Sequence, residues 1–207
     1  MKKKKKSKNW LTSRNREYFY KQAKVYGYRS RSAYKLIEMN NKFKFIKNGS
    51  FLLDLGASPG GWSQVASEII KNGKILAVDI INMEKINKVN FVLSDINDKN
   101  FYPKIESFFN KKIDIVISDM AANTTGNKDL DSFRTGELCL NALELSSKIL
   151  NKNGVFLSKV FMGSIFEEIQ EKAKKYFKKV IKYKPLSSKK ESKEIYIYCK
   201  GVLKSDT

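Results

Sequence analysis

Histidine is absent from this chain of 207 residues. Its absence excludes Ser-His-Asp and Cys-His catalysis, metal sites with histidine ligands, and imidazole as a general base. Any acid–base chemistry therefore falls to lysine, carboxylate, tyrosine or cysteine side chains. The two cysteines, Cys139 and Cys199, stand far apart and form no Cys-x-x-Cys motif. We predict that both fill the core of an intracellular protein, with neither a disulfide framework nor a metal site.

Long apolar runs are also absent. No segment of about 18 apolar residues is present, so we predict no membrane span. The lysine run Lys2–Lys6 is not followed by the apolar segment of a secretory signal. The lysine-rich start is thus left open as an organellar targeting segment, a nuclear address or an RNA-binding tail. With 42% hydrophobic residues, the chain has enough apolar material for one globular core.

Positive charge is concentrated in two segments. The chain has 41 Lys and Arg residues against 21 Asp and Glu, a net charge of +20. Residues 1–35 hold 13 basic residues and 1 acidic residue, and residues 172–193 hold 10 basic residues and 1 acidic residue, so the remainder is nearly neutral. This distribution predicts a protein that grips a polyanion, with nucleic acid as the leading partner, because phosphate contacts release condensed counterions.

The first basic segment favours RNA. We expect residues 1–30 to be a basic arm that is partly mobile, and residues 31–207 to be one domain. Between Tyr26 and Lys35, arginines are interleaved with tyrosines. Guanidinium groups pair with phosphate, and tyrosine rings stack on unpaired bases. The candidate RNA-binding residues are Arg14, Arg16, Arg29, Arg31 and Tyr34.

Strand-like and helix-like segments alternate along the domain. The pattern predicts an amphipathic helix over about 30–47, then strands at 51–57, 74–80, 90–94, 113–120, 154–161, 180–183 and 194–200. Further helices are expected at 61–71, 99–110, 133–150 and 164–177. Continuous apolar strands that alternate with helices predict a doubly wound α/β fold, with helices on both faces of a mostly parallel sheet. The segment 184–193 is too short for a crossover helix, so we expect the last two strands to pair antiparallel.

The segment Phe51–Trp62 is typical of a buried strand, a glycine-rich turn and a helix start. Doubly wound folds bind nucleotides at this turn, where glycines let a ligand approach the backbone. The turn does not match the dinucleotide fingerprint, because Ser58 occupies the place of the middle glycine of Gly-x-Gly-x-x-Gly. The Gly-Lys-Ser/Thr of a phosphate loop is missing as well. A nicotinamide dehydrogenase is therefore disfavoured.

Four predicted strands carry an aspartate at or near their ends: Asp54, Asp79, Asp95 and Asp119. The carboxyl ends of parallel strands share one edge of a sheet, where ligands bind. Asp54 would repel a pyrophosphate and suits a cationic or amino-bearing ligand such as S-adenosylmethionine, and Asp79 stands where such folds bind a ribose diol. One such aspartate is commonly a helix cap or turn residue, but four in register favour a ligand site.

The segment Asp54–Gln64, preceded by Arg29–Leu36, resembles the FtsJ/RrmJ type of S-adenosylmethionine-dependent ribose 2′-O-methyltransferases. The segments Ser118–Ala121, Lys159–Phe161 and Ser192–Tyr196 resemble the same family. The resemblance runs from about Asn15 to Gly201. It implies a Rossmann-like methyltransferase fold with a mostly parallel seven-stranded sheet and a C-terminal antiparallel hairpin.

The resemblance implies a catalytic tetrad of Lys35, Asp119, Lys159 and Glu194. It also implies contacts to the cofactor and no required metal. Together with residues of the glycine turn, the predicted cofactor-binding set is Asp54, Gly56, Gly60, Gly61, Trp62, Asp79, Asp95 and Asp119. We expect Lys159 at a strand end, where burial would lower its pKa and favour the neutral amine that abstracts a hydroxyl proton. Lys35 and Glu194 could then orient the ribose.

The Gly60–Trp62 run resembles the bacterial and mitochondrial branch that acts on large-subunit ribosomal RNA, and Thr125–Asp131 is similar to its mitochondrial members. The tRNA branch tends to carry Cys in place of Gly56 and Gly-Ser in place of Gly60-Gly61. Ser58 and Asn123 depart mildly from the family pattern, outside the implied catalytic set.

The resemblance therefore implies in-line transfer of a methyl group from S-adenosylmethionine to the 2′-oxygen of a ribose, most simply a uridine, in large-subunit ribosomal RNA. It implies a monomer, placed in the mitochondrion if the source is eukaryotic and otherwise in the cytoplasm or nucleolus. Two alternatives stay open: the same chemistry on tRNA or an mRNA cap, and a catalytically silent RNA-binding factor of ribosome assembly.

Overall fold

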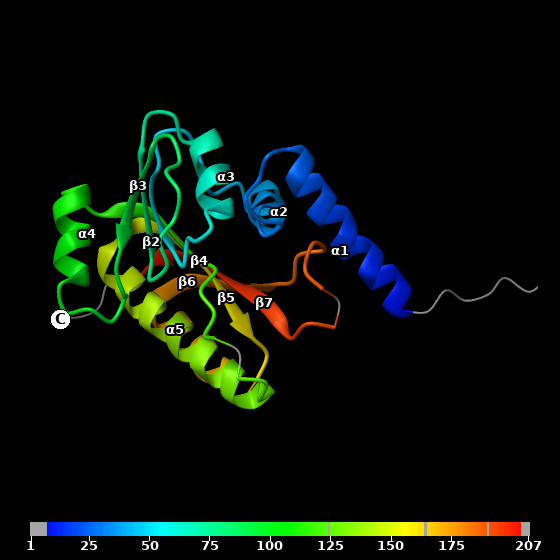
Figure 1. Ribbon diagram of the computed structural model, residues 1–207. Coiled ribbons are helices and arrows are strands. Elements are labelled where there is room, and N and C mark those ends of the chain that lie inside the picture. The colour runs from blue at the N-terminus through cyan, green and yellow to red at the C-terminus, as the bar shows by residue number, and fades with distance from the viewer. Residues whose placement is uncertain (1–7, 124, 164, 190, 204–207) are drawn as a thin grey trace, which may run out of the picture.

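The computed structural model describes residues 8–123, 125–163, 165–189 and 191–203, and their side chains from Glu17 onward. Its centre is a seven-stranded sheet in the order β3-β2-β1-β4-β5-β7-β6 (Figure 1). The strands are β1 Phe51–Leu55, β2 Lys74–Asp79, β3 Val89–Leu93, β4 Ile113–Ser118, β5 Leu150–Phe161, β6 Phe177–Tyr183 and β7 Glu194–Val202. The helices are α1 Lys8–Val25, α2 Ala33–Phe43, α3 Gly61–Ile69, α4 Phe101–Phe109, α5 Lys128–Ile149 and α6 Phe166–Tyr176.

The sheet is parallel except at its C-terminal strand. β1 pairs in parallel with β2 and β4, and β3 and β5 extend the parallel part on either side. β7 lies between β5 and β6 and is antiparallel to both. The predicted fold class and the predicted antiparallel pairing are therefore confirmed, since the short 184–193 segment reverses the chain directly.

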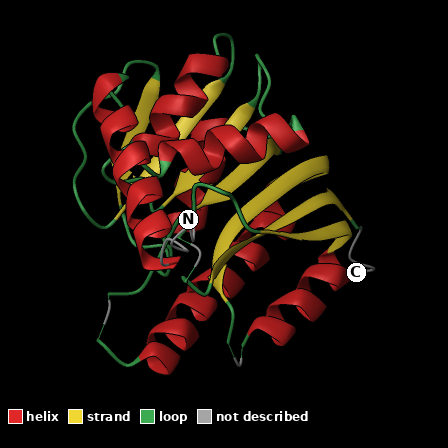
Figure 2. Ribbon diagram, turned by 90° about the vertical axis from the view of Figure 1, so that its right-hand side faces the viewer, coloured by secondary structure: helices red, strands yellow, loops and turns green. Residues whose placement is uncertain are grey.

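Helices cover both faces of the sheet, as Figure 2 shows. Successive strand residues point to opposite faces, so Leu52 packs with α2 and α3 while Leu53 packs with α4, α5 and α6. Both cysteines are buried on the second of these faces, in agreement with their predicted role in the core. Among the described helices, none is long and apolar enough to cross a membrane.

Most element boundaries differ by a few residues from those expected; β5 begins four residues early and β6 three residues early. Residues 8–25, expected as part of an arm, form helix α1, which projects from the sheet in Figure 1 but packs Ala23 and Phe19 at its end onto the domain. Helix α5 begins five residues early, because the Asn127 side chain accepts hydrogen bonds from the amides of Asp129 and Leu130. Helix α2 is shorter than expected. It ends at Phe43, and the next residue, Lys44, caps it with a left-handed backbone conformation. The predicted mobile start, residues 1–7, lies outside the described residues.

A buried carboxyl group joins β1 to α3. Asp54 is 1% exposed, and its Oδ2 accepts a 2.6 Å hydrogen bond from the Ser63 hydroxyl. Among the described residues, its Oδ1 has no hydrogen-bond partner. Burial raises the pKa of Asp54 to about 7, the charges of Asp119 and Asp79 add to the rise, and the Ser63 hydrogen bond opposes it.

This carboxyl group should make stability depend on pH. The folded-state pKa of about 7 lies above the unfolded value of roughly 3.9, so the folded state holds a proton that the unfolded chain releases between these values. The stabilising contribution is complete below the unfolded pKa and is lost as the pH rises to about 7, at up to about 1.4 kcal/mol per pH unit. We expect Asp54→Asn to flatten this fall, measured by urea unfolding between about pH 4.5 and 8. Asp129→Asn, at an exposed position on α5, should keep the wild-type slope, and equal slopes for Asp54→Asn and the wild type would contradict the prediction.

Candidate active site

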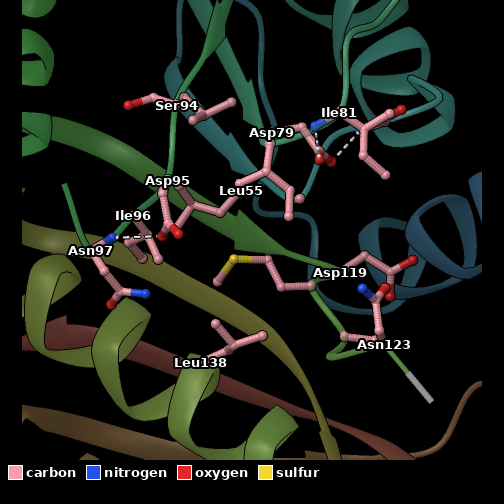
Figure 3. Close-up of a pocket in the computed structure, with 16 residues that line it drawn as sticks. Leu55, Asp79, Ile81, Ser94, Asp95, Ile96, Asn97, Asp119, Asn123 and Leu138 are labelled. Atoms are coloured by element: carbon pink, nitrogen blue, oxygen red, sulfur yellow. Dashed lines mark hydrogen bonds between the residues drawn. The ribbon is translucent and has the colours of Figure 1, made fainter. Parts of the chain in front are cut away.

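A cavity of about 270 Å³ opens at the carboxyl ends of β1, β2 and β4. Three of the four predicted aspartates line it: Asp79, Asp95 and Asp119. Figure 3 shows the three residues around the pocket, with Asp79 at the top, Asp95 at the left and Asp119 at the right. Apolar side chains complete the wall, among them Leu55, Val78, Ile81, Met120 and Leu138. Acidic groups beside apolar walls suit a ligand that is both flat and partly cationic.

Backbone amides hold two of these carboxylates. Asp79, the last residue of β2, accepts hydrogen bonds from the amides of Ser58 at 2.8 Å and Ile81 at 2.9 Å. Asp95 accepts from the amide of Asn97 at 2.8 Å. A carboxylate oxygen has more than one acceptor site, so both groups can still bind ligand hydroxyls or amines.

The glycine turn approaches β4 closely. Gly56 has a φ of +72°, and a Cβ there would lie 2.6 Å from Cγ of Met120 and 2.9 Å from its backbone. Gly56 lines the cavity, so glycine is needed both for this backbone conformation and for the contact. The Ser58–Pro59 peptide bond in the same turn is cis.

Four residues of the predicted cofactor set do not line this cavity: Asp54, Gly60, Gly61 and Trp62. Asp54 sits inside β1 and faces α3, because β1 continues to Leu55 and neighbouring residues of a strand point to opposite faces. Gly61 lies against the Ser30 side chain, and the Trp62 indole donates to the carbonyl of Ser32 at 2.9 Å. These residues brace the turn and α2.

The predicted tetrad comes together beside the cavity. Lys35 Nζ lies 2.6 Å from Glu194 Oε1, and Lys159 Nζ lies 3.2 Å from Asp119 Oδ1. Lys159 also donates to the backbone carbonyl of Asp119. Both lysines are only 7% exposed. The site therefore consists of two buried lysine–carboxylate pairs.

Strand register explains how distant residues meet here. Ser118 of β4 pairs with Ser158 of β5, which places the following residues, Asp119 and Lys159, side by side. Lys159 lies opposite Tyr196 of β7, and Glu194 precedes Tyr196 by two residues, so it shares the same face. Lys159 was expected at a strand end, but β5 continues two residues further.

Tyr196 links the two pairs. Its hydroxyl donates to Asp119 Oδ1 at 2.9 Å, and Lys35 Nζ lies 5.7 Å from its ring centroid. The ring also packs against Trp62, at 5.8 Å between centroids. Tyr196 was not among the site residues predicted from the sequence, although its two-residue spacing from Glu194 on one strand was an available signal.

The charges of this cluster stabilise one another. Burial alone would raise the pKa of Asp119, but the nearby charges of Lys159 and Lys35, with the Tyr196 hydrogen bond, hold that pKa below its usual value. Burial and the Asp119 charge raise the pKa of Tyr196 well above its usual value. Asp119 is therefore a carboxylate, and Tyr196 is a neutral donor, throughout the physiological range.

The predicted RNA-binding residues have different surroundings. The Arg29 guanidinium is bound to the carbonyl oxygens of Pro59, Glu84 and Lys85 at 3.2, 2.6 and 2.9 Å, so it braces the glycine turn. Arg31 is half-buried beside the tetrad, where its charge acts on Tyr196. The Tyr34 ring packs on Phe19 and Tyr28, whereas the side chains of Arg14 and Arg16 in α1 are outside the described part.

Metal ligands are not grouped in the described part of the chain. There, no cluster of three or more histidine, cysteine, aspartate or glutamate side chains could hold an ion. The acidic groups of the cavity are instead held by amides, a tyrosine and lysines.

Solved structures share this architecture. The crystal structure described as that of a ribosomal RNA methyltransferase from Plasmodium falciparum aligns with a TM-score of 0.78 and 36% identity, covering 86% of this chain and 100% of that one. A methyltransferase fold from Streptococcus mutans, solved with S-adenosylhomocysteine, aligns with a TM-score of 0.53 and 16% identity over 81% of this chain and 97% of that one. The fold is that of Rossmann-like S-adenosylmethionine-dependent methyltransferases.

Sequence comparisons give the family. The protein named ribosomal RNA large subunit methyltransferase E in Pelagibacter ubique is 49% identical over 200 residues, which cover 97% of this chain and 98% of that protein. The family model described as FtsJ-like methyltransferase matches residues 28–202. This span includes the glycine turn, the three cavity aspartates and all four residues of the tetrad. The chain therefore belongs to the FtsJ-like methyltransferase family, as the resemblance of its motifs indicates.

Proposed function

We propose that this protein methylates the 2′-oxygen of a ribose, that of a uridine, in large-subunit ribosomal RNA, with S-adenosylmethionine as methyl donor. One observation carries the proposal: Asp119 both lines the acidic cavity and pairs with Lys159. A ligand in the cavity and a substrate at the tetrad would therefore meet at one carboxylate. Relatives named as large-subunit ribosomal RNA methyltransferases support the choice of RNA.

The cavity fits this cofactor. A molecule with a sulfonium, an ammonium and a ribose diol needs acidic acceptors and an apolar slot, and the walls supply both. Asp79, at the end of β2, would accept hydrogen bonds from the diol, and Asp95 and Asp119 would supply negative charge. When bound, S-adenosylmethionine supplies an electrophilic methyl group. Asp54 acts from beneath the turn, by holding α3 to β1.

The tetrad would prepare the hydroxyl. Once it has lost its own proton to solvent, Lys159 would accept the 2′-hydroxyl proton, and the charge of Asp119 would stabilise the resulting ammonium. Lys35 and Glu194 would hold the ribose in place, since positioning of reactants supplies much of the rate. Tyr196 keeps Asp119 turned toward Lys159.

The basic segments would hold the RNA. Residues 1–35 and 172–193 carry most of the excess positive charge, and Arg31, Tyr34, Arg14 and Arg16 remain candidates for phosphate and base contacts. We propose a monomer that acts inside the cell, where ribosomal RNA is found.

Methyl transfer from labelled S-adenosylmethionine tests the substrate. Large ribosomal subunits that lack the modification, naked ribosomal RNA and tRNA are offered in parallel, and the labelled nucleotide is mapped. Label at a ribose of large-subunit RNA is expected. Label confined to tRNA would move the activity to that substrate, and label in none of them would favour an assembly factor.

Lys159→Ala should reduce turnover by at least about a hundredfold, because proton transfer to a positioned base contributes roughly 10² to 10⁴ in rate. The dissociation constant for S-adenosylmethionine, measured by calorimetry, should stay near the wild-type value because Lys159 does not line the cavity. Lys152→Ala, at the exposed start of the same strand, is the control and should keep full turnover. Turnover retained in Lys159→Ala would contradict the assignment of the base.

Asp79→Ala should weaken S-adenosylmethionine binding by about 10- to 100-fold, as expected for loss of hydrogen bonds to a charged acceptor. Calorimetry gives the dissociation constant, and circular dichroism checks that the variant is folded. Asp98→Ala, in the loop after β3, alters an aspartate outside the cavity wall and should bind as the wild type does. Wild-type affinity in Asp79→Ala would place the diol elsewhere.

A further inference from the structure

Glu38 lies one helical turn after Lys35 on α2, and its carboxylate accepts four hydrogen bonds. Oε1 accepts from the Tyr183 hydroxyl at 2.8 Å and from the Leu186 amide at 2.7 Å. Oε2 accepts from the amide and the hydroxyl of Ser187, at 3.1 and 3.0 Å. One carboxylate on α2 therefore binds the end of β6 and the turn that follows it.

The same turn reaches the tetrad. It closes with a 3.1 Å hydrogen bond from the Ser188 amide to the Pro185 carbonyl. The Ser188 hydroxyl then donates at 2.9 Å to Glu194 Oε1, the oxygen that also binds Lys35. A continuous set of contacts thus runs from Glu38 through the turn to the Lys35–Glu194 pair.

Polar contacts hold most of this turn, in which Pro185 is also buried. Leu186 is 82% exposed, whereas Ser187 and Ser188 are 5% and 7% exposed. Leu186 contributes little burial, so beside the buried Pro185 the Leu186–Ser187 part of the turn is held by its hydrogen bonds to Glu38. The loop passes below α2 in Figure 1, which is consistent with these contacts.

Tyr183, at the end of β6, is also held in place against α2. Burial and the Glu38 charge raise the pKa of Tyr183 to about 12, so the phenol stays protonated and donates. The Tyr183 ring packs against Phe43 at 5.6 Å between centroids, with Lys42 Nζ 4.7 Å from its centroid. All three partners come from α2, the helix that carries Lys35.

We propose that Glu38 is a positioning residue of the active site, which sets the Glu194 carboxylate against Lys35 by fixing the turn that carries Ser188. The inference rests on the proposed function, because the Lys35–Glu194 pair orients the ribose only if the protein methylates RNA. Glu38 touches neither cavity nor tetrad directly. Its effect should therefore fall on the rate of the bound complex and not on cofactor affinity.

Two substitutions test the proposal. Glu38→Gln keeps the size of the side chain but replaces one carboxylate oxygen with an NH2 group, which cannot accept the hydrogen bonds that this oxygen receives. Ser188→Ala removes only the hydroxyl that donates to Glu194. We expect each to lower kcat by about tenfold, with an unchanged dissociation constant for S-adenosylmethionine and a folded circular dichroism spectrum. Glu144→Gln is the matched control, because Glu144 also joins two helices, α5 and α6, away from the site. It should keep the wild-type kcat.

Rescue and coupling separate positioning from general stabilisation. Ser188→Thr retains the hydroxyl and should restore kcat to within about threefold of wild type. The double variant Glu38→Gln/Ser188→Ala should be no slower than the slower single variant, because both act through Glu194. An unchanged kcat in folded Ser188→Ala, or single effects that multiply in the double variant, would overturn the proposal. If Glu38→Gln does not fold, the kcat values of Ser188→Ala and Ser188→Thr still test the proposal. Absence of ribose methylation by the wild type would overturn the proposed function and this inference together.

Discussion

The carboxylate of Asp119 is the group on which the rest of the site depends. It lines the cavity on one side and binds Lys159 and Tyr196 on the other. A buried carboxylate is costly unless cations and donors compensate for lost water. Two of the compensating groups stand on β5 and β7, so Asp119 keeps its charge only where these strands pair in register. The chemistry at the edge of the sheet thus requires the antiparallel strand at its C-terminal end.

The lack of histidine makes this dependence stronger. A lysine that accepts a proton becomes an ammonium, and here each lysine faces a carboxylate that stabilises this charge. Tyr196 connects the two pairs, so removal of one member leaves its neighbours partly unpaired. The network extends outward through Ser188 and ends at Glu38. A lysine side chain is flexible, so its position at the site depends on the residues that hold its carboxylate partner, here Ser188 and, through the turn, Glu38.

The parts of the structure that follow from local pattern were predictable from the sequence. The parallel strands are apolar runs, and Asp79, Asp95 and Asp119 line the cavity because each stands at or just after a strand end. Asp54, expected at the same edge, lies outside the cavity wall and faces α3, since a shift of one residue along β1 moves a side chain to the other face. Arg29 was expected on phosphate, but the folded chain surrounds it with carbonyl oxygens from residues that lie far away in the sequence. Helix α1 was missed because its apolar residues do not form a regular stripe.

The site thus has two halves with different origins. On the cofactor side, Asp79 and Asp95 bind amides two residues further along the chain, and Asp79 also accepts from the Ser58 amide of the glycine turn. On the tetrad side, the Lys35–Glu194 contact spans 159 residues, and the Glu38 contacts span up to 149. Contacts over such separations form only after the central strands have aligned α2 with β7. The Asp79 and Asp95 side of the cavity therefore depends largely on short motifs, whereas the geometry of Asp119 and the other reacting groups is a property of the whole sheet.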